Sequence, residues 1–107
     1  MTTGFPSPAQ YYREKNINLN EYLVPHPEST FFMRVKGSSY EEFEVYKDDV
    51  LIIDRSCVPK DYDLVLAIVD GRRRLMRYRR PLVFREGDPA TEIWGTVTCV
   101  IHIKRLS

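Results

Sequence analysis

Cysteine and histidine are scarce in this chain, which has two of each among its 107 residues. Cys57 and Cys99 lack the paired spacing of a zinc site and are too few for a disulfide framework, so each is predicted to be a buried or half-buried thiol. His26 and His102 lie far apart in the sequence, which favours structural roles over a histidine metal site. The sequence therefore predicts no metal centre and no cofactor.

Long apolar runs and an excess of one charge are also missing. No stretch approaches the roughly 18 apolar residues of a membrane span, and the first ten residues lack the apolar centre of a signal peptide. We therefore expect a cytoplasmic protein with no membrane partner. Sixteen basic and fifteen acidic residues leave a formal charge of +1, so direct DNA binding is expected to be weak or absent.

The length and the 43% hydrophobic content suit one compact domain with a single core. Four of the seven prolines fall within the first 30 residues, and proline fixes φ and removes an amide donor. Residues 1–28 are therefore predicted to form an extended N-terminal arm and residues 29–107 a β domain. Within the arm, we expect one helical turn over residues 8–15 and a linker over residues 16–23.

From residue 30 onward the apolar residues follow a period of two, which is typical of short antiparallel strands. The predicted strands cover residues 31–36, 50–53, 64–69, 72–78 and 91–104. Asp70-Gly71 predicts a type I′ hairpin turn between the third and fourth of them. The continuous apolar run over residues 50–53 indicates a strand buried on both faces. The fold class is therefore mostly β.

The last strand carries apolar residues of one parity: Ile93, Val97, Cys99, Ile101 and Ile103. A long terminal strand of this kind is expected to lie at an open sheet edge, which a second copy of the chain would cover. The sequence thus predicts a homodimer.

Charge is segregated along the chain. Acidic residues gather in one segment: Glu41, Glu42, Glu44, Asp48 and Asp49. Arginines gather on the second hairpin strand and after it: Arg72, Arg73, Arg74, Arg77, Arg79, Arg80 and Arg85. Because alternate residues of a strand face opposite ways, these arginines do not form one flat stripe. A solvated edge, a surface for a protein partner and a phosphate-contacting patch all remain open.

Ser39 is a candidate nucleophile, since it follows Gly37-Ser38 just after a strand. A serine becomes a nucleophile only when a neighbouring base takes its proton. Neither histidine lies in a suitable context, so a Ser-His-Asp arrangement is not favoured. The other base that serves this purpose is a lysine held neutral by burial.

Several motifs occur together in a characteristic order, and the resemblance that they carry runs from Gly4 to about Ile103. They are Gly4-Phe5-Pro6-Ser7-Pro8-Ala9, Asn18-Leu19-Asn20, His26-Pro27, Ser29-Thr30-Phe31-Phe32, Gly37-Ser38-Ser39, Leu51-Ile52-Ile53-Asp54, Val69-Asp70-Gly71 and Trp94-Gly95-Thr96-Val97-Thr98. In these motifs the chain resembles the LexA/UmuD family of self-cleaving serine peptidases, and within it the processed form of the UmuD subunits. The resemblance implies curled antiparallel sheets like those of the LexA C-terminal domain, with an extended N-terminal arm.

The resemblance also assigns the catalytic positions. Ser39 matches the nucleophile of the family's Gly-Asp-Ser-Met motif, while Ser38 and Tyr40 depart from it. The family's catalytic lysine lies five residues beyond the glycine of Val-Asp-Gly, and that position is Met76. Methionine fits a slot shaped for a long unbranched side chain but cannot accept a proton.

Ser39 is therefore predicted to be catalytically silent. Arg77 cannot replace the lysine, because a guanidinium stays protonated. Rescue by Lys36 or Lys104 is left open.

The family is cleaved just ahead of the glycine that matches Gly4, and only three residues precede Gly4 here. The chain is therefore expected to correspond to the processed form, with Thr3 and Gly4 as the remnant of the cleavage site. By resemblance, we expect a homodimeric accessory subunit of a UmuC-like Y-family DNA polymerase acting in translesion synthesis during the SOS response. Contact with a RecA filament is left open. The alternatives are an active Ser-Lys self-cleaving peptidase and a nucleic-acid-binding module that uses the arginines.

Overall fold

The computed structural model describes residues 17–37, 40–79 and 90–106. Within them, five antiparallel strands form one sheet in the order β1-β2-β5-β3-β4. The strands are β1 (Thr30–Arg34), β2 (Val50–Asp54), β3 (Leu64–Val69), β4 (Arg72–Arg77) and β5 (Thr91–Ile101). The mostly β fold and all five predicted strands are thus confirmed, with ends that differ by a few residues.

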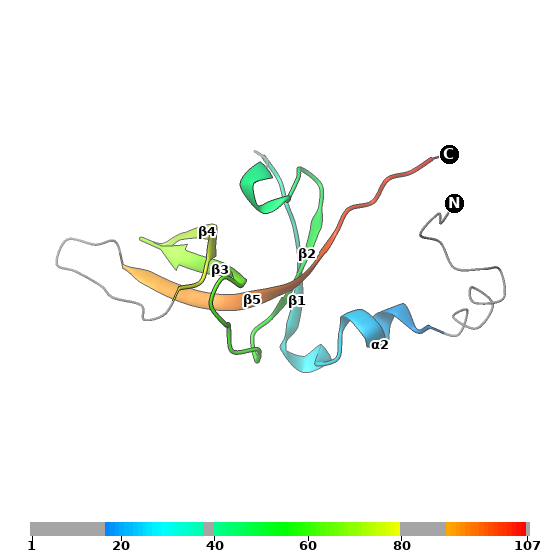
Figure 1. The fold of residues 1–107 in the computed structure, drawn as a ribbon, viewed down its shortest axis with the longest axis horizontal. Coiled ribbons are helices and arrows are strands. Elements are labelled where there is room, and N and C mark those ends of the chain that lie inside the picture. Colours follow the sequence, from blue (N-terminus) through cyan, green and yellow to red (C-terminus); the bar gives the residue numbers. More distant parts are fainter. Residues whose placement is uncertain (1–16, 38–39, 80–89, 107) are drawn as a thin grey trace, which may run out of the picture.

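Strand β5 is the central strand of this sheet. Its first half pairs with β3 and its second half with β2, so that Thr96 lies opposite both Val65 and Asp54. In Figure 1 the orange β5 accordingly runs past β3 and β4 along one part of its length and past β1 and β2 along the other. The prediction of an open edge at the last strand is wrong, because the edges are β1 and β4. Period-two alternation reports which face of a strand is buried and says nothing about neighbours in the plane of the sheet.

The pairing of β5 is irregular at two points. Its register shifts once against β2 and once against β3, so one residue is skipped at each place. As a result Trp94 and Val97, which have opposite parity in the sequence, both pack against the core. The single parity predicted for this strand does not hold along its whole length.

The turn between β3 and β4 has the geometry that its sequence predicts. Asp70 and Gly71 have φ values of 50° and 80°, and the flanking residues Val69 and Arg72 are paired. Positive φ at both central residues is the signature of the type I′ turn, which matches the twist of the two strands.

The core is formed by the strands together with the chain that follows β1. Its buried members are Val35, Val45, Leu51, Ile53, Leu64, Leu66 and Leu75. Four of the five residues of β2 are buried, as predicted for this run. The buried core members come from β2, β3, β4 and the segment after β1, and the partly buried Met33, Trp94 and Val97 add β1 and β5.

Short helices precede and interrupt the strands: α2 (Leu19–Leu23), η1 (Pro27–Ser29) and η2 (Glu41–Phe43). The prediction of a linker over residues 16–23 is wrong, because α2 occupies most of it. The Asn18 side chain caps this helix by accepting a hydrogen bond from the Glu21 amide at 3.2 Å. The helical turn predicted over residues 8–15 lies outside the described residues.

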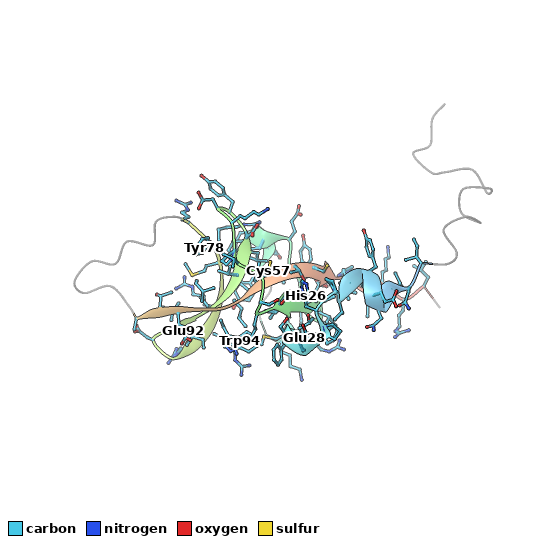
Figure 2. All side chains as sticks on the ribbon, turned by 90° about the horizontal axis from the view of Figure 1, so that it is seen from below. His26, Glu28, Cys57, Tyr78, Glu92 and Trp94 are labelled. Atoms are coloured by element: carbon cyan, nitrogen blue, oxygen red, sulfur yellow. The ribbon has the colours of Figure 1, made fainter. Side chains whose placement is uncertain are left out.

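Helix α2 stands beyond the end of the sheet in both views, with its side chains projecting from it (Figure 2). In the part of the chain that the structure describes, none of the helices has the length and apolar character needed to cross a bilayer.

Candidate functional site

Met76, at the predicted lysine position, lies near the end of edge strand β4. It is paired with the fully buried Val65 of β3 and is itself half-buried. Along β4, the neighbouring Leu75 is buried in the core, whereas Arg77 is exposed. A thioether at this place is partly removed from water without needing a hydrogen bond or a counter-ion.

The segment that carries Ser39 is described only at its two ends. Gly37 has a φ of 81°, a left-handed conformation that glycine adopts without strain. Tyr40 forms a β-bridge with Val45, through hydrogen bonds of 2.8 and 3.2 Å. Ser39 itself, its neighbour Ser38 and the cleavage-site remnant Thr3-Gly4 lie outside the described residues.

Met76 borders a cavity that also reaches the described residues just after Ser39, and we call it the Met76 cavity. It measures about 490 Å³, and its walls include Met76 from β4 together with Tyr40 and Phe43 from the segment after Ser39. Tyr40 and Phe43 stack with a centroid distance of 6.5 Å. The fold thus brings the residue that follows Ser39 to the same hollow as Met76.

Arginines form the polar rim of the Met76 cavity. Arg74, Arg77 and Arg79 line it, opposed by the single acidic side chain of Glu42. The Arg77 guanidinium carbon lies 5.3 Å from the centroid of the Phe43 ring, and Arg77 Nη1 donates to the Tyr62 carbonyl at 3.2 Å. These two contacts hold the Arg77 side chain over the Phe43 ring at the rim of the cavity.

Neither lysine considered as a substitute base has the surroundings that such a base needs. Lys36 and Lys104 are both solvent-exposed.

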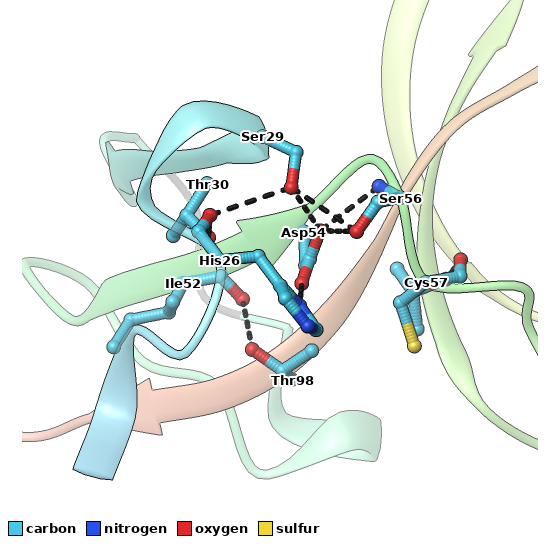
Figure 3. Close-up of polar contacts among 9 residues, drawn as sticks. His26, Ser29, Thr30, Ile52, Asp54, Ser56, Cys57 and Thr98 are labelled. Atoms are coloured by element: carbon cyan, nitrogen blue, oxygen red, sulfur yellow. Dashed lines mark hydrogen bonds and ion pairs between the residues drawn. The ribbon is translucent and has the colours of Figure 1, made fainter. Parts of the chain in front are cut away.

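A second polar cluster lies at the end of β2, around the buried Asp54 (Figure 3). Its Oδ2 lies 2.7 Å from His26 Nδ1, and its Oδ1 accepts hydrogen bonds from the Ser29 and Ser56 hydroxyls at 2.8 and 2.7 Å. Burial by itself would raise the pKa of Asp54, but the hydrogen bonds from Ser56, His26 and Ser29 outweigh it and hold the pKa well below its usual value. This cluster fastens the segment before β1 to the end of β2.

A matching pair lies at the start of β2. Asp49 is 1% exposed, and its Oδ1 lies 2.6 Å from Nδ1 of His102, just beyond β5. Burial acts to raise the pKa of Asp49, yet the amide of Tyr46 and the imidazole of His102 lower it overall. The structural roles predicted for both histidines are confirmed. Asp49 is a buried anchor, whereas the other acidic residues of the same segment, Glu41, Glu42, Glu44 and Asp48, are exposed.

Sequence reasoning did not identify either carboxylate as buried. The sequence did contain a signal for these buried carboxylates. Asp49 and Asp54 flank a wholly apolar run, and the two histidines of the chain are available as their partners. The thiols were predicted in part: Cys99 is half-buried as expected, whereas Cys57 is exposed, and both are free.

Fold and geometry together define a small β domain in which a strand-end turn and an edge strand border one cavity. Residues 1–87 match the family described as Peptidase S24-like. The chain is 39% identical to protein ImpA of Escherichia coli over 114 residues, which cover 95% of this chain and 79% of ImpA. It is 38% identical to protein MucA of Salmonella typhimurium over 112 residues, or 92% of this chain and 77% of MucA.

LexA repressor 1 of Geobacter sulfurreducens is 28% identical over 109 residues, which cover 88% of this chain and 53% of the repressor. The chain belongs to the S24-like peptidase family. The LexA/UmuD family inferred from the motifs is thereby confirmed.

Proposed function

We propose that this protein is a homodimeric accessory subunit of a UmuC-like Y-family DNA polymerase in SOS mutagenesis, and that it does not cleave peptide bonds. The proposed lack of peptidase activity rests on the position of Met76. Met76 lines the same cavity as Tyr40, the residue that follows Ser39. A serine without a base gains none of the roughly 10²- to 10⁴-fold acceleration that general-base assistance supplies. Ser39 is then a retained hydroxyl with no proton acceptor.

Labelling with a fluorophosphonate tests the silence of Ser39, since this reagent reacts with activated serines. We expect no labelling of the unmodified chain. The variant Met76→Lys, and the fuller variant Ser38→Asp/Tyr40→Met/Met76→Lys that restores the family motif, should gain labelling that depends on Ser39. Adding Ser39→Ala to each variant is the matched control.

The alternative function is an active Ser-Lys peptidase, which membership of the S24-like family favours. Labelling of the unmodified chain that disappears in Ser39→Ala would establish it and overturn the proposal of a silent subunit. Because residue 76 is methionine, a lysine elsewhere in the chain would then have to act as the base. Labelling of the Lys36→Ala and Lys104→Ala variants would identify which lysine does so.

An apolar groove beside α2 supports the proposal of a homodimer. The groove measures about 240 Å³ and is lined in part by Leu19 and Leu23 of α2, Phe32 of β1 and Ile101 of β5. Phe32 is 61% exposed and Leu19 65%, which is unusual for large apolar side chains that lie side by side. We propose this face as the contact between two copies of the chain.

The polymerase partner is tested by co-purification. A tagged form of this protein, expressed with the UmuC-like polymerase of the same cell, should retain that polymerase through gel filtration. Loss of the complex under these conditions would remove the accessory-subunit proposal while leaving the test of Ser39 unaffected.

A further inference from the structure

The curl of the sheet creates a second pocket between its two edge strands. In the strand order, β1 and β4 are separated by four spacings, which would be about 19 Å in a flat sheet at about 4.8 Å per spacing. Nevertheless Met33 of β1 and Leu75 of β4 line one pocket of about 330 Å³. We call it the edge pocket.

The floor of the edge pocket is apolar and rigid. Met33 is paired with Leu51 across β1 and β2, and Leu66 with Leu75 across β3 and β4. The three leucines are buried members of the core, so their positions are fixed by packing on every other side. A floor of this kind favours an apolar group of a ligand.

The rim of the edge pocket is cationic. Arg34 and Lys36 line it from the side of β1, and Arg73 and Arg74 line it from β4. All four side chains are exposed, and none of the lining residues is acidic. This one-sided charge contrasts with the near balance of the whole chain, whose formal charge is +1.

Among the described residues, the cations of the rim form no ion pair with a carboxylate. Arg34 Nη1 donates to the backbone carbonyl of Asp48 at 3.3 Å, which leaves its charge uncompensated. Arg73 and Arg74 have no ion-pair partner within the described residues. Each arginine guanidinium at the pocket mouth can donate two parallel N–H hydrogen bonds to one carboxylate.

We propose that the edge pocket binds an acidic peptide segment of a partner protein. An apolar side chain of the segment enters between Leu51 and Leu75, and flanking Glu or Asp carboxylates meet Arg73 and Arg74. A peptide fits better than a nucleic acid, because the floor of the pocket is apolar. The proposal does not depend on the assigned polymerase role.

The test uses fluorescence anisotropy with a labelled probe peptide, Glu-Leu-Glu-Phe-Glu-Leu, and the whole protein. Binding in the micromolar range that weakens as the salt concentration rises is the expected result. The double variant Arg73→Glu/Arg74→Glu should weaken it on the order of tenfold or more. Arg72→Glu is the matched control, since Arg72 is exposed on the same strand but does not line the pocket, and should change affinity less than about twofold.

Two control probes separate the parts of the proposal. A peptide with serine in place of leucine and phenylalanine should lose most of the affinity, and one with lysine in place of glutamate should lose all of it. Equal binding of the serine peptide would refute the role of the apolar floor. If the peptide does not bind even at millimolar protein, the proposal is overturned and β4 is a solvated strand. If duplex DNA binds more tightly than the peptide, and Arg72→Glu weakens DNA binding as much as Arg73→Glu/Arg74→Glu does, β4 is a polyanion-binding strand and the proposal is also overturned.

Discussion

Two buried carboxylates bracket β2 and determine where the ends of the domain attach. Asp54 closes the strand and holds His26, which lies before β1, while Asp49 precedes the strand and holds His102, which follows β5. A buried carboxylate is costly unless hydrogen bonds compensate it, so each aspartate requires its partners to stay in place. The most buried strand of the sheet thereby anchors segments from both ends of the described chain.

The Asp54→Asn variant should lower the free energy of unfolding by about 2 kcal/mol at pH 7. The amide keeps the shape of the carboxylate but loses charge-assisted hydrogen bonds from Ser56, Ser29 and His26, which are among the stronger kind. Urea denaturation measures the change. Asp48→Asn is a suitable control, because Asp48 is exposed with a φ of 73° that asparagine tolerates, and it should have little effect.

The pH dependence of stability follows from the same two carboxylates. The pKa values of Asp49 and Asp54 are lower in the folded than in the unfolded protein, where an aspartate titrates near 3.9. Their stabilising contribution is therefore complete above about pH 4 and is lost as the pH falls through the folded-state values. Melting temperatures between pH 6 and pH 2 should fall steeply in the unmodified protein and less steeply in Asp54→Asn. Parallel curves would contradict this assignment.

At the scale of elements, β5 decides how the sheet curls. It joins the β1–β2 half to the β3–β4 half, and Thr96 belongs to both. The register shift on each side lets the strand turn between the two halves, which is the usual effect of a bulge on a strand. The curl in turn brings β1 and β4 to the same pocket.

Gly95→Ala should destabilise the protein by about 1–3 kcal/mol. A Cβ at residue 95 would lie 2.5 Å from Ile53 Cγ2, in a β2 strand that has no room to yield. The cost should shrink in an Ile53→Ala background, which removes the clashing atom, and a double-mutant cycle by urea denaturation measures the difference. If Gly95→Ala lowers the free energy of unfolding equally in the unmodified protein and in Ile53→Ala, the destabilisation does not come from the contact with Ile53.

At the scale of the whole molecule, the proposed dimer depends on the groove beside α2. The variant Phe32→Glu places a charge on this apolar face and should weaken self-association at least tenfold without unfolding the chain, because Phe32 is already 61% exposed. Light scattering over a range of micromolar concentrations measures the mass. Val58→Glu changes a residue that is 74% exposed and does not line the groove, and should leave the mass of the dimer unchanged. A monomeric mass for the unmodified protein would refute the dimer itself.

The sequence by itself determined the class of the protein, its five strands and the type I′ turn. These properties are local: alternation of apolar residues sets strands, and Asp70-Gly71 sets a turn whatever lies around it. The family followed from motifs that keep their order along the chain. The helix at Leu19–Leu23 was also local, and its signal was the Asn18 cap with Glu21 three residues later.

Only the tertiary structure decided which strand is central, which aspartates are buried and which cations share a pocket. Each of these depends on segments that are distant in the sequence, such as β1 and β4 at the edge pocket or Asp49 and His102 at the start of β2. Period-two patterning describes one strand at a time and contains no information on its neighbours. The pairing of β5 on both sides, and the curl that follows from it, arise from the packing of the whole sheet.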